Sequence, residues 1–131
     1  MSIDPIARKL LPDTAEVVDG RLRIGGCDVI DIAKRFGTPV FIYDEEHLRT
    51  RCREAVAAFG EGVAYASKAF LSKAMARIVF EEGMYMDVAT GGELHIALAA
   101  GVPGARLVFH GNNKSIDELA MAIDSSVGRI V

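Results

Sequence analysis

A lysine, two carboxylates and a histidine fall at or just after the ends of short apolar runs, where they could do acid–base or nucleophilic chemistry. Lys68 stands in AYASKAF, Asp87 and Glu93 in YMDVATGGE, and His110 in FHGNNK. A lysine among apolar and aromatic neighbours pays a desolvation cost that disfavours its ammonium form. A neutral amine is what Schiff-base chemistry needs, so Lys68 is the candidate nucleophile. The plainer interpretation is a lysine whose ammonium reaches water from a strand end.

Each of the other three polar residues also has an ordinary explanation, as a loop carboxylate, a helix-capping acid or a satisfied histidine. Their convergence on one rim of a sheet is the stronger indication. Thr90-Gly91-Gly92 could bind an anion through free backbone N–H groups, although helix initiation alone also accounts for these residues. The three histidines lack metal-ligand spacing and carboxylate companions, so no metal site is expected.

From Asp44 onward the chain alternates helical and extended patterns. Apolar strands are predicted over residues 63–67, 84–88, 106–109 and 128–131, with helices over 44–59, 71–82 and 92–100 and from Ser115 onward. Glu118 completes a Ser-x-x-Glu capping box with Ser115. Successive strands at roughly twenty-residue spacing indicate βα units and a parallel sheet covered by helices. A doubly wound sheet and a (β/α)8 barrel share this local pattern.

The first third of the chain has a different pattern. Residues 14–24 alternate apolar and polar side chains around Asp19-Gly20, which predicts a β-hairpin. Gly25-Gly26 is expected to break the second strand. A short helix is predicted over residues 29–36, ended by Gly37, and an apolar run follows at residues 40–43.

Composition and charge describe a globular protein. The chain has 131 residues, half of them hydrophobic, and a formal net charge of −3, which gives no electrostatic case for nucleic acid or acidic membranes. The N-terminus lacks a secretory signal and no run approaches a membrane span, so a cytoplasmic protein with reduced thiols at Cys27 and Cys52 is expected. A full barrel needs about 250 residues, and the last strand stops at Val131, which predicts part of a longer protein.

Three motifs resemble those of the diaminopimelate decarboxylases: YASKAF, DVATGGEL and HGNNKS, in this order and spacing. The segment FGTPVFIYDEEHLR resembles the strand and first helix that precede them in that family. The resemblance covers Phe36 to Leu119, most of the chain. The wider group of ornithine and arginine decarboxylases shares the lysine, the aspartate and the glutamate but usually carries a different strand end in place of HGNNKS.

The resemblance implies an α/β fold with two parts. Residues 44–131 would be the first half of a (β/α)8 TIM barrel that binds pyridoxal 5′-phosphate (PLP). Residues 1–43 would be the N-terminal segment of a β-domain. It further implies a homodimer that decarboxylates meso-2,6-diaminopimelate to L-lysine. The family's glycine-rich phosphate loop and its substrate-binding arginine and tyrosines lie in the later half, so the 131-residue chain alone is expected to be inactive.

The resemblance also assigns roles to residues. Lys68 would form the Schiff base with PLP, and the residues lining the cofactor would be Ala66, Asp87, Glu93, His110 and Asn112. Two alternatives stay open. One is another PLP barrel enzyme, an ornithine or arginine decarboxylase or an alanine racemase. The other is a non-catalytic pseudo-enzyme that serves as a binding module on the same fold, which would have no need of Lys68.

Overall fold

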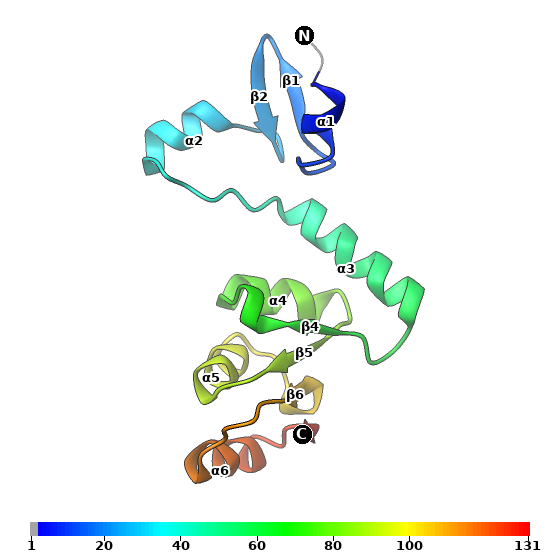
Figure 1. Cartoon of the computed structure of the whole chain (residues 1–131), viewed down its shortest axis with the longest axis vertical. Coiled ribbons are helices and arrows are strands. Elements are labelled where there is room, and N and C mark those ends of the chain that lie inside the picture. The colour runs from blue at the N-terminus through cyan, green and yellow to red at the C-terminus, as the bar shows by residue number, and fades with distance from the viewer. Residues whose placement is uncertain (1–2) are drawn as a thin grey trace. The chain divides into compact units, whose positions relative to one another are not determined.

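The computed structural model describes residues 3–131 (Figure 1). The chain divides into two compact units, one up to Thr50 and one from Arg51 onward. The division falls inside helix α3, Glu45–Phe59. The expected domain boundary between residues 43 and 44 stays a prediction.

The first unit contains a small antiparallel sheet, in the order β1-β2-β3, and two short helices. Its elements are α1 (Pro5–Arg8), β1 (Glu16–Val18), β2 (Arg21–Ile24), β3 (Cys27–Asp28) and α2 (Val29–Phe36). Asp19 and Gly20 both have positive φ, 51° and 77°, as the tight turn of a two-residue hairpin requires. The predicted hairpin is therefore present. The helix over residues 29–36 is also present, with Asp28 at its N-cap.

The expected break of the second strand at Gly25-Gly26 is confirmed, because β2 ends at Ile24. These glycines do not end the sheet but turn the chain back, with φ of 55° and 76°, so that Ile24 pairs with Cys27 in β3. A glycine pair permits either a break or a tight turn, because both use its freedom to adopt positive φ. Two elements were not expected from the sequence: strand β3, and helix α1, whose N-cap is Asp4.

Asp44 ties the hairpin to the start of α3. Its carboxylate accepts hydrogen bonds from the Thr14 hydroxyl and from the His47 backbone N–H, the latter at 3.1 Å. The Thr14 hydroxyl oxygen in turn accepts the Gly25 N–H at 2.9 Å. Asp44 is only 6% exposed, and this buried carboxylate is satisfied by partners from two segments of the first unit, the residues before β1 and the start of α3.

The second unit is a run of βα units around a parallel four-stranded sheet, in the order β4-β5-β6-β7. Its strands are β4 (Ala64–Ala66), β5 (Tyr85–Val88), β6 (Leu107–Phe109) and β7 (Arg129–Ile130), and its helices are α4 (Lys73–Glu81), α5 (Gly91–Ala99) and α6 (Ile116–Asp124). The predicted parallel α/β pattern is confirmed. Helix α4 begins later than expected, because Ser72 caps it through the Met75 N–H.

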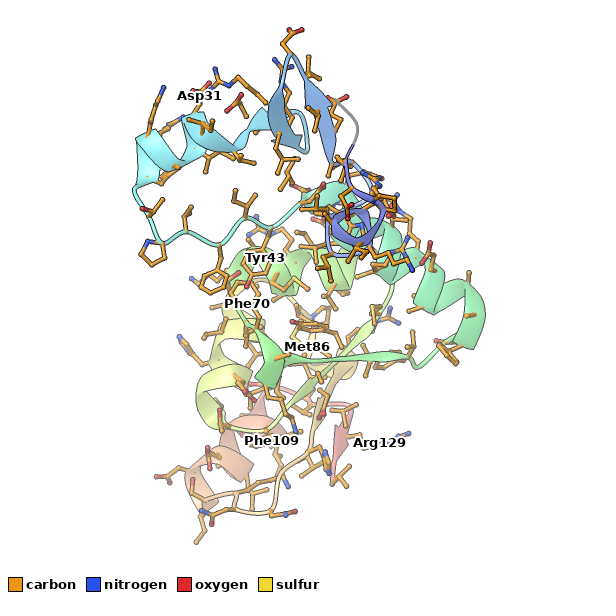
Figure 2. All side chains as sticks on the ribbon, turned by 45° about the horizontal axis from the view of Figure 1, so that its top comes forward. Asp31, Tyr43, Phe70, Met86, Phe109 and Arg129 are labelled. Atoms are coloured by element: carbon orange, nitrogen blue, oxygen red, sulfur yellow. The ribbon has the colours of Figure 1, made fainter. Side chains whose placement is uncertain are left out.

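The helices cover one face of this sheet. Met86, Val88, Leu107 and Phe109 share that face and are at most 1% exposed. Met86 and Phe109 are labelled in Figure 2. Their buried partners include Met75, Ala76 and Val79 of α4, Leu94 and Ala97 of α5, and Ala122 of α6. The alternate residues Ala66, Asp87 and Val108 lie in register on the opposite face, which is exposed or half-buried.

Among residues 3–131, no helix combines the length and apolar character that crossing a membrane requires.

Candidate functional site

Lys68 lies on a turn directly after β4. It is the middle residue of a 3-10 turn, Ser67–Ala69, and the Tyr65 hydroxyl braces this turn by donating to the Phe70 carbonyl at 2.7 Å. The Lys68 side chain is exposed, so the burial that its apolar neighbours predicted is not present in this chain. The preceding residue, Ser67, is 2% exposed, and its hydroxyl is buried with no hydrogen-bond partner among the described residues.

Asp87 occupies the neighbouring strand, and its Cα pairs with that of Ala66 on β4. One carboxylate oxygen, Oδ2, lies 3.8 Å from Nδ1 of His110, which is ion-pair distance for a protonated imidazole. The other oxygen, Oδ1, is buried and has no hydrogen-bond partner in the described part of the chain. His110 follows β6, and its backbone N–H donates to the Val88 carbonyl at 2.9 Å. The predicted convergence of Asp87 and His110 is therefore seen.

Glu93 is bound to the backbone at the start of α5. Its Oε2 accepts the Ala89 N–H at 2.5 Å, while its own N–H donates to the Thr90 hydroxyl at 3.2 Å. Gly91 N–H donates to Oε1 of Glu118 at 2.6 Å. The idea of an anion site at Thr90-Gly91-Gly92 therefore loses support, because side chains of the protein already accept the N–H groups of Gly91 and Glu93.

The remaining expected site residues occupy the same edge of the sheet. Ala66 ends β4 and is exposed, and Asn112 is exposed in the loop after β6. The carboxyl ends of neighbouring parallel strands lie at one edge, so the turn with Lys68, the end of β5 with Asp87 and the loop with His110 are adjacent. The role of each of these residues toward a cofactor stays a prediction. No group of three or more metal-ligating side chains gathers within residues 3–131.

A hollow of about 430 Å³ lies at the other end of the sheet, where the strands begin. In parallel α/β folds chemistry collects at the carboxyl ends of the strands, so this hollow is not the candidate site. Its lining residues are Glu61, Gly62, Tyr85, Ala105, Leu107, Val108, Gly128 and Arg129.

Two residues near the site were missed by the sequence reasoning. Ser67 is an ordinary small polar residue in the sequence, and only its burial singles it out. Glu118 was recognised as half of a capping box, which the structure confirms, but its bond to Gly91 joins residues far apart in the sequence. Hydrogen bonds from the backbone N–H groups of Ser115 and Gly91 lower the pKa of Glu118.

The residues at this edge suit a cofactor that carries a carbonyl group and polar ring atoms. Lys68 offers an accessible amine, and two buried polar atoms, Ser67 Oγ on the same turn and Asp87 Oδ1 on the neighbouring strand, have no hydrogen-bond partner among residues 3–131. Buried polar atoms are rarely left unsatisfied, so each is a point at which a bound group can form a hydrogen bond. These residues fit PLP.

Comparisons with known proteins agree with this fit. Residues 45–131 match the family described as pyridoxal-dependent decarboxylase, pyridoxal binding domain. A diaminopimelate decarboxylase of Mycobacterium bovis is 50% identical over 114 residues, which are 86% of this chain and 26% of that protein. A diaminopimelate decarboxylase of Bacillus subtilis is 48% identical over 117 residues, 86% of this chain and 27% of that protein. The chain thus spans about a quarter of the length of these relatives.

Solved structures agree in fold. The crystal structure of a diaminopimelate decarboxylase from M. jannaschii in co-complex with L-lysine has a TM-score of 0.84 and 35% identity, over 91% of this chain and 30% of that one. The structure of AQ1208 from Aquifex aeolicus has a TM-score of 0.83 and 33% identity, over 89% and 30%. The α/β fold is therefore that of part of a PLP-binding barrel.

Proposed function

Because this chain belongs to the family of pyridoxal-dependent decarboxylases, through its pyridoxal-binding domain, we propose that it is the N-terminal part of a diaminopimelate decarboxylase. The reaction removes CO2 from meso-2,6-diaminopimelate and leaves L-lysine. The observation that carries the proposal is the position of Lys68, on the turn after β4 and beside the strand that bears Asp87. The relatives that match most of this chain support the choice of substrate, since they bear the name of that enzyme.

When bound, PLP supplies an electron sink that stabilises the charge left on the substrate as the carboxylate departs. The chain's own residues hold that group in place. Lys68 would hold the cofactor through its carbonyl group. Asp87 would offer Oδ1 as a hydrogen-bond acceptor for the cofactor, while Nδ1 of His110 lies 3.8 Å from its Oδ2.

Two further parts of the proposal concern the whole protein. It works as a homodimer on a small amino-acid substrate, and it is located in the cytoplasm. The homodimer rests on the resemblance of the YASKAF, DVATGGEL and HGNNKS motifs to the family, and the cytoplasmic location on the expectations from the sequence. The first 43 residues contribute to its β-domain, to which the antiparallel sheet β1-β2-β3 is suited.

The test of the proposal is covalent trapping of PLP in the full-length protein. Borohydride reduction followed by peptide mass spectrometry should place PLP on Lys68 in the wild type and nowhere in Lys68→Ala. Lys73→Ala is the matched control, because Lys73 is also exposed and is the first residue of the following helix, α4. PLP trapped on another lysine would refute the assignment of Lys68.

Substrate profiling decides among the enzymes of this fold. CO2 release from meso-diaminopimelate, with little from ornithine or arginine, is the expected result. Racemisation of alanine or a preference for ornithine would instead identify the protein as another PLP barrel enzyme. PLP binding with no reaction on any of these substrates would favour the non-catalytic binding module.

A further inference from the structure

The carboxylate of Glu118 bridges two neighbouring loops of the sheet. Its Oε2 accepts the backbone N–H and the hydroxyl of Ser115, at 2.8 and 3.0 Å, and so closes the N-terminus of α6. Its Oε1 accepts the Gly91 N–H at 2.6 Å, at the start of α5. A capping box needs only the first of these oxygens. The second oxygen, Oε1, bonds to a residue of the preceding βα unit.

The two loops also touch through their backbones. The His110 N–H donates to the Val88 carbonyl at 2.9 Å. A Cβ added to Gly111 would lie 2.8 Å from the Ala89 carbonyl oxygen, so only glycine permits this approach. A Cβ added to Gly91 would lie 2.8 Å from Cγ of Glu118. The loop after β5 is therefore held against the loop after β6 at three successive points.

The segment that Glu118 holds lies between two of the expected cofactor residues. Asp87 precedes it on β5, and Glu93 follows it in α5, where Oε2 of Glu93 accepts the Ala89 N–H. Without Glu118, the Gly91 N–H would lose its acceptor, and the loop could shift without disturbing the buried face of the sheet. A displacement of about 1 Å in a residue that positions a reactive group can cost roughly a hundredfold in rate.

We propose that Glu118 is a positioning residue for the PLP site, holding the loop after β5 in the conformation that presents Asp87 and Glu93 to the cofactor. The inference rests on the proposed function. Glu118 itself acts through the Gly91 N–H, and its negative charge also suits the N-termini of both α5 and α6.

Variants of Glu118 in the full-length protein test this inference. Glu118→Ala removes both acceptors, while Glu118→Gln keeps a carbonyl oxygen that can still accept from Gly91 N–H. The matched control is Asp117→Asn, which removes a carboxylate from the same first turn of α6 but from an exposed position. Affinity for PLP should fall roughly ten- to hundredfold in Glu118→Ala, the range expected when a hydrogen bond to a charged group is lost. It should fall less in Glu118→Gln and stay within about twofold in Asp117→Asn.

Two readouts separate positioning from a general loss of stability. Amide hydrogen exchange at Gly91 should speed up in Glu118→Ala and not in Asp117→Asn, with or without PLP. PLP affinity should fall even at temperatures well below the unfolding midpoint of the variant. If Glu118→Ala fails to fold, Glu118→Gln and Gly91→Ala supply the same measurements, since an added Cβ at residue 91 displaces the Glu118 side chain.

A double-mutant cycle completes the test. Gly91→Ala should reduce PLP affinity less in the Glu118→Ala background than in the wild type. Both the clash of the added Cβ and the hydrogen bond from the residue 91 N–H involve the Glu118 side chain. Additive effects would overturn the inference but not the proposed function. The same holds if the PLP affinity of Glu118→Ala equals that of Asp117→Asn. A wild type that does not trap PLP on Lys68 would overturn the proposed function, and the inference with it.

Discussion

The two oxygens of the Asp87 carboxylate lie in different surroundings. Oδ2 faces His110 at 3.8 Å, and Oδ1 is buried without a hydrogen-bond partner among residues 3–131. The sequence predicted that Asp87 and His110 would meet, because both stand at the ends of neighbouring apolar runs. It could not predict which oxygen would be unpartnered, since that depends on side-chain rotamers and on the packing of the turn around Ser67.

A second buried carboxylate, Asp44, gives a prediction about stability. Burial alone would raise the pKa of Asp44, but hydrogen bonds from the Thr14 hydroxyl and the His47 and Glu46 N–H groups outweigh it and lower the pKa. The folded pKa therefore lies below the unfolded value of about 3.9. The contribution of the ionised carboxylate is complete above that value and is lost as the pH falls through the folded pKa.

Asp44→Asn should lower the free energy of unfolding by about 1.5 kcal/mol near neutral pH, as expected for hydrogen bonds to a charged group. The difference from wild type should shrink as the pH falls below about 4. Denaturant unfolding of the full-length protein at several pH values measures this. Asp19→Asn is the control, because Asp19 is exposed at a turn position of positive φ that asparagine tolerates. A pH-independent difference would contradict the argument.

At the scale of elements, capping residues and periodicity were enough to predict most of the helices. Helix α2 has the predicted bounds because Asp28 and Gly37 mark both of its ends. The start of α4 was misplaced because Leu71 suits the apolar pattern, whereas Ser72 is the residue that caps the helix. Strand β3 was missed because two residues are too few to show an alternating pattern.

Close contact between backbones fixes how the last βα unit meets the preceding one. The Gly128 N–H donates to the Gly104 carbonyl at 2.9 Å, and a Cβ at residue 104 would lie 1.9 Å from the Ser125 carbonyl oxygen. Neither the backbone at residue 104 nor that at Ser125 can move aside without a large cost in free energy. Gly104→Ala should therefore destabilise the full-length protein by about 3 kcal/mol, at the upper end of overpacking effects.

Thermal unfolding would measure this, with Gly92→Ala as the matched substitution. A Cβ at residue 92 meets only the Thr90 hydroxyl oxygen at 3.8 Å, an ordinary contact. Alanine also suits a helix better than glycine by about 0.5 kcal/mol, so this variant should be neutral or slightly stabilised. Equal shifts of the unfolding midpoint in the two variants would refute the role assigned to Gly104.

At the scale of the whole molecule, the sequence could not choose between a doubly wound sheet and a barrel, because both consist of the same βα units. The structure supplies the missing information in its strand order. The four parallel strands follow the order of the sequence with no reversal, whereas a doubly wound sheet reverses at its switch point. The match to solved relatives at TM-scores above 0.8 agrees with part of a barrel.

Within the second unit, α4, α5 and α6 cover only one face of the sheet, and the other face bears on how the 131-residue polypeptide should behave alone. Ala64 and Ala66 are exposed on that other face. On the helix-covered face, Ile130 of the terminal strand β7, which pairs with Phe109, is 40% exposed. Within the described residues, β7 pairs only with β6, so its other edge presents unpaired backbone groups. Exposed apolar surface and open strand edges promote association.

We therefore expect the isolated chain to associate and to release no CO2 from diaminopimelate. Light scattering after size-exclusion chromatography should give masses above 14.1 kDa that rise with concentration. Ile130→Lys should reduce this association, because a charge on an edge strand opposes pairing with another chain. Ile6→Lys is the control, since Ile6 is a 74% exposed apolar residue of the first unit and belongs to no strand of this sheet. A monomer with decarboxylase activity would show that the open face needs no covering and that residues 3–131 already hold PLP productively.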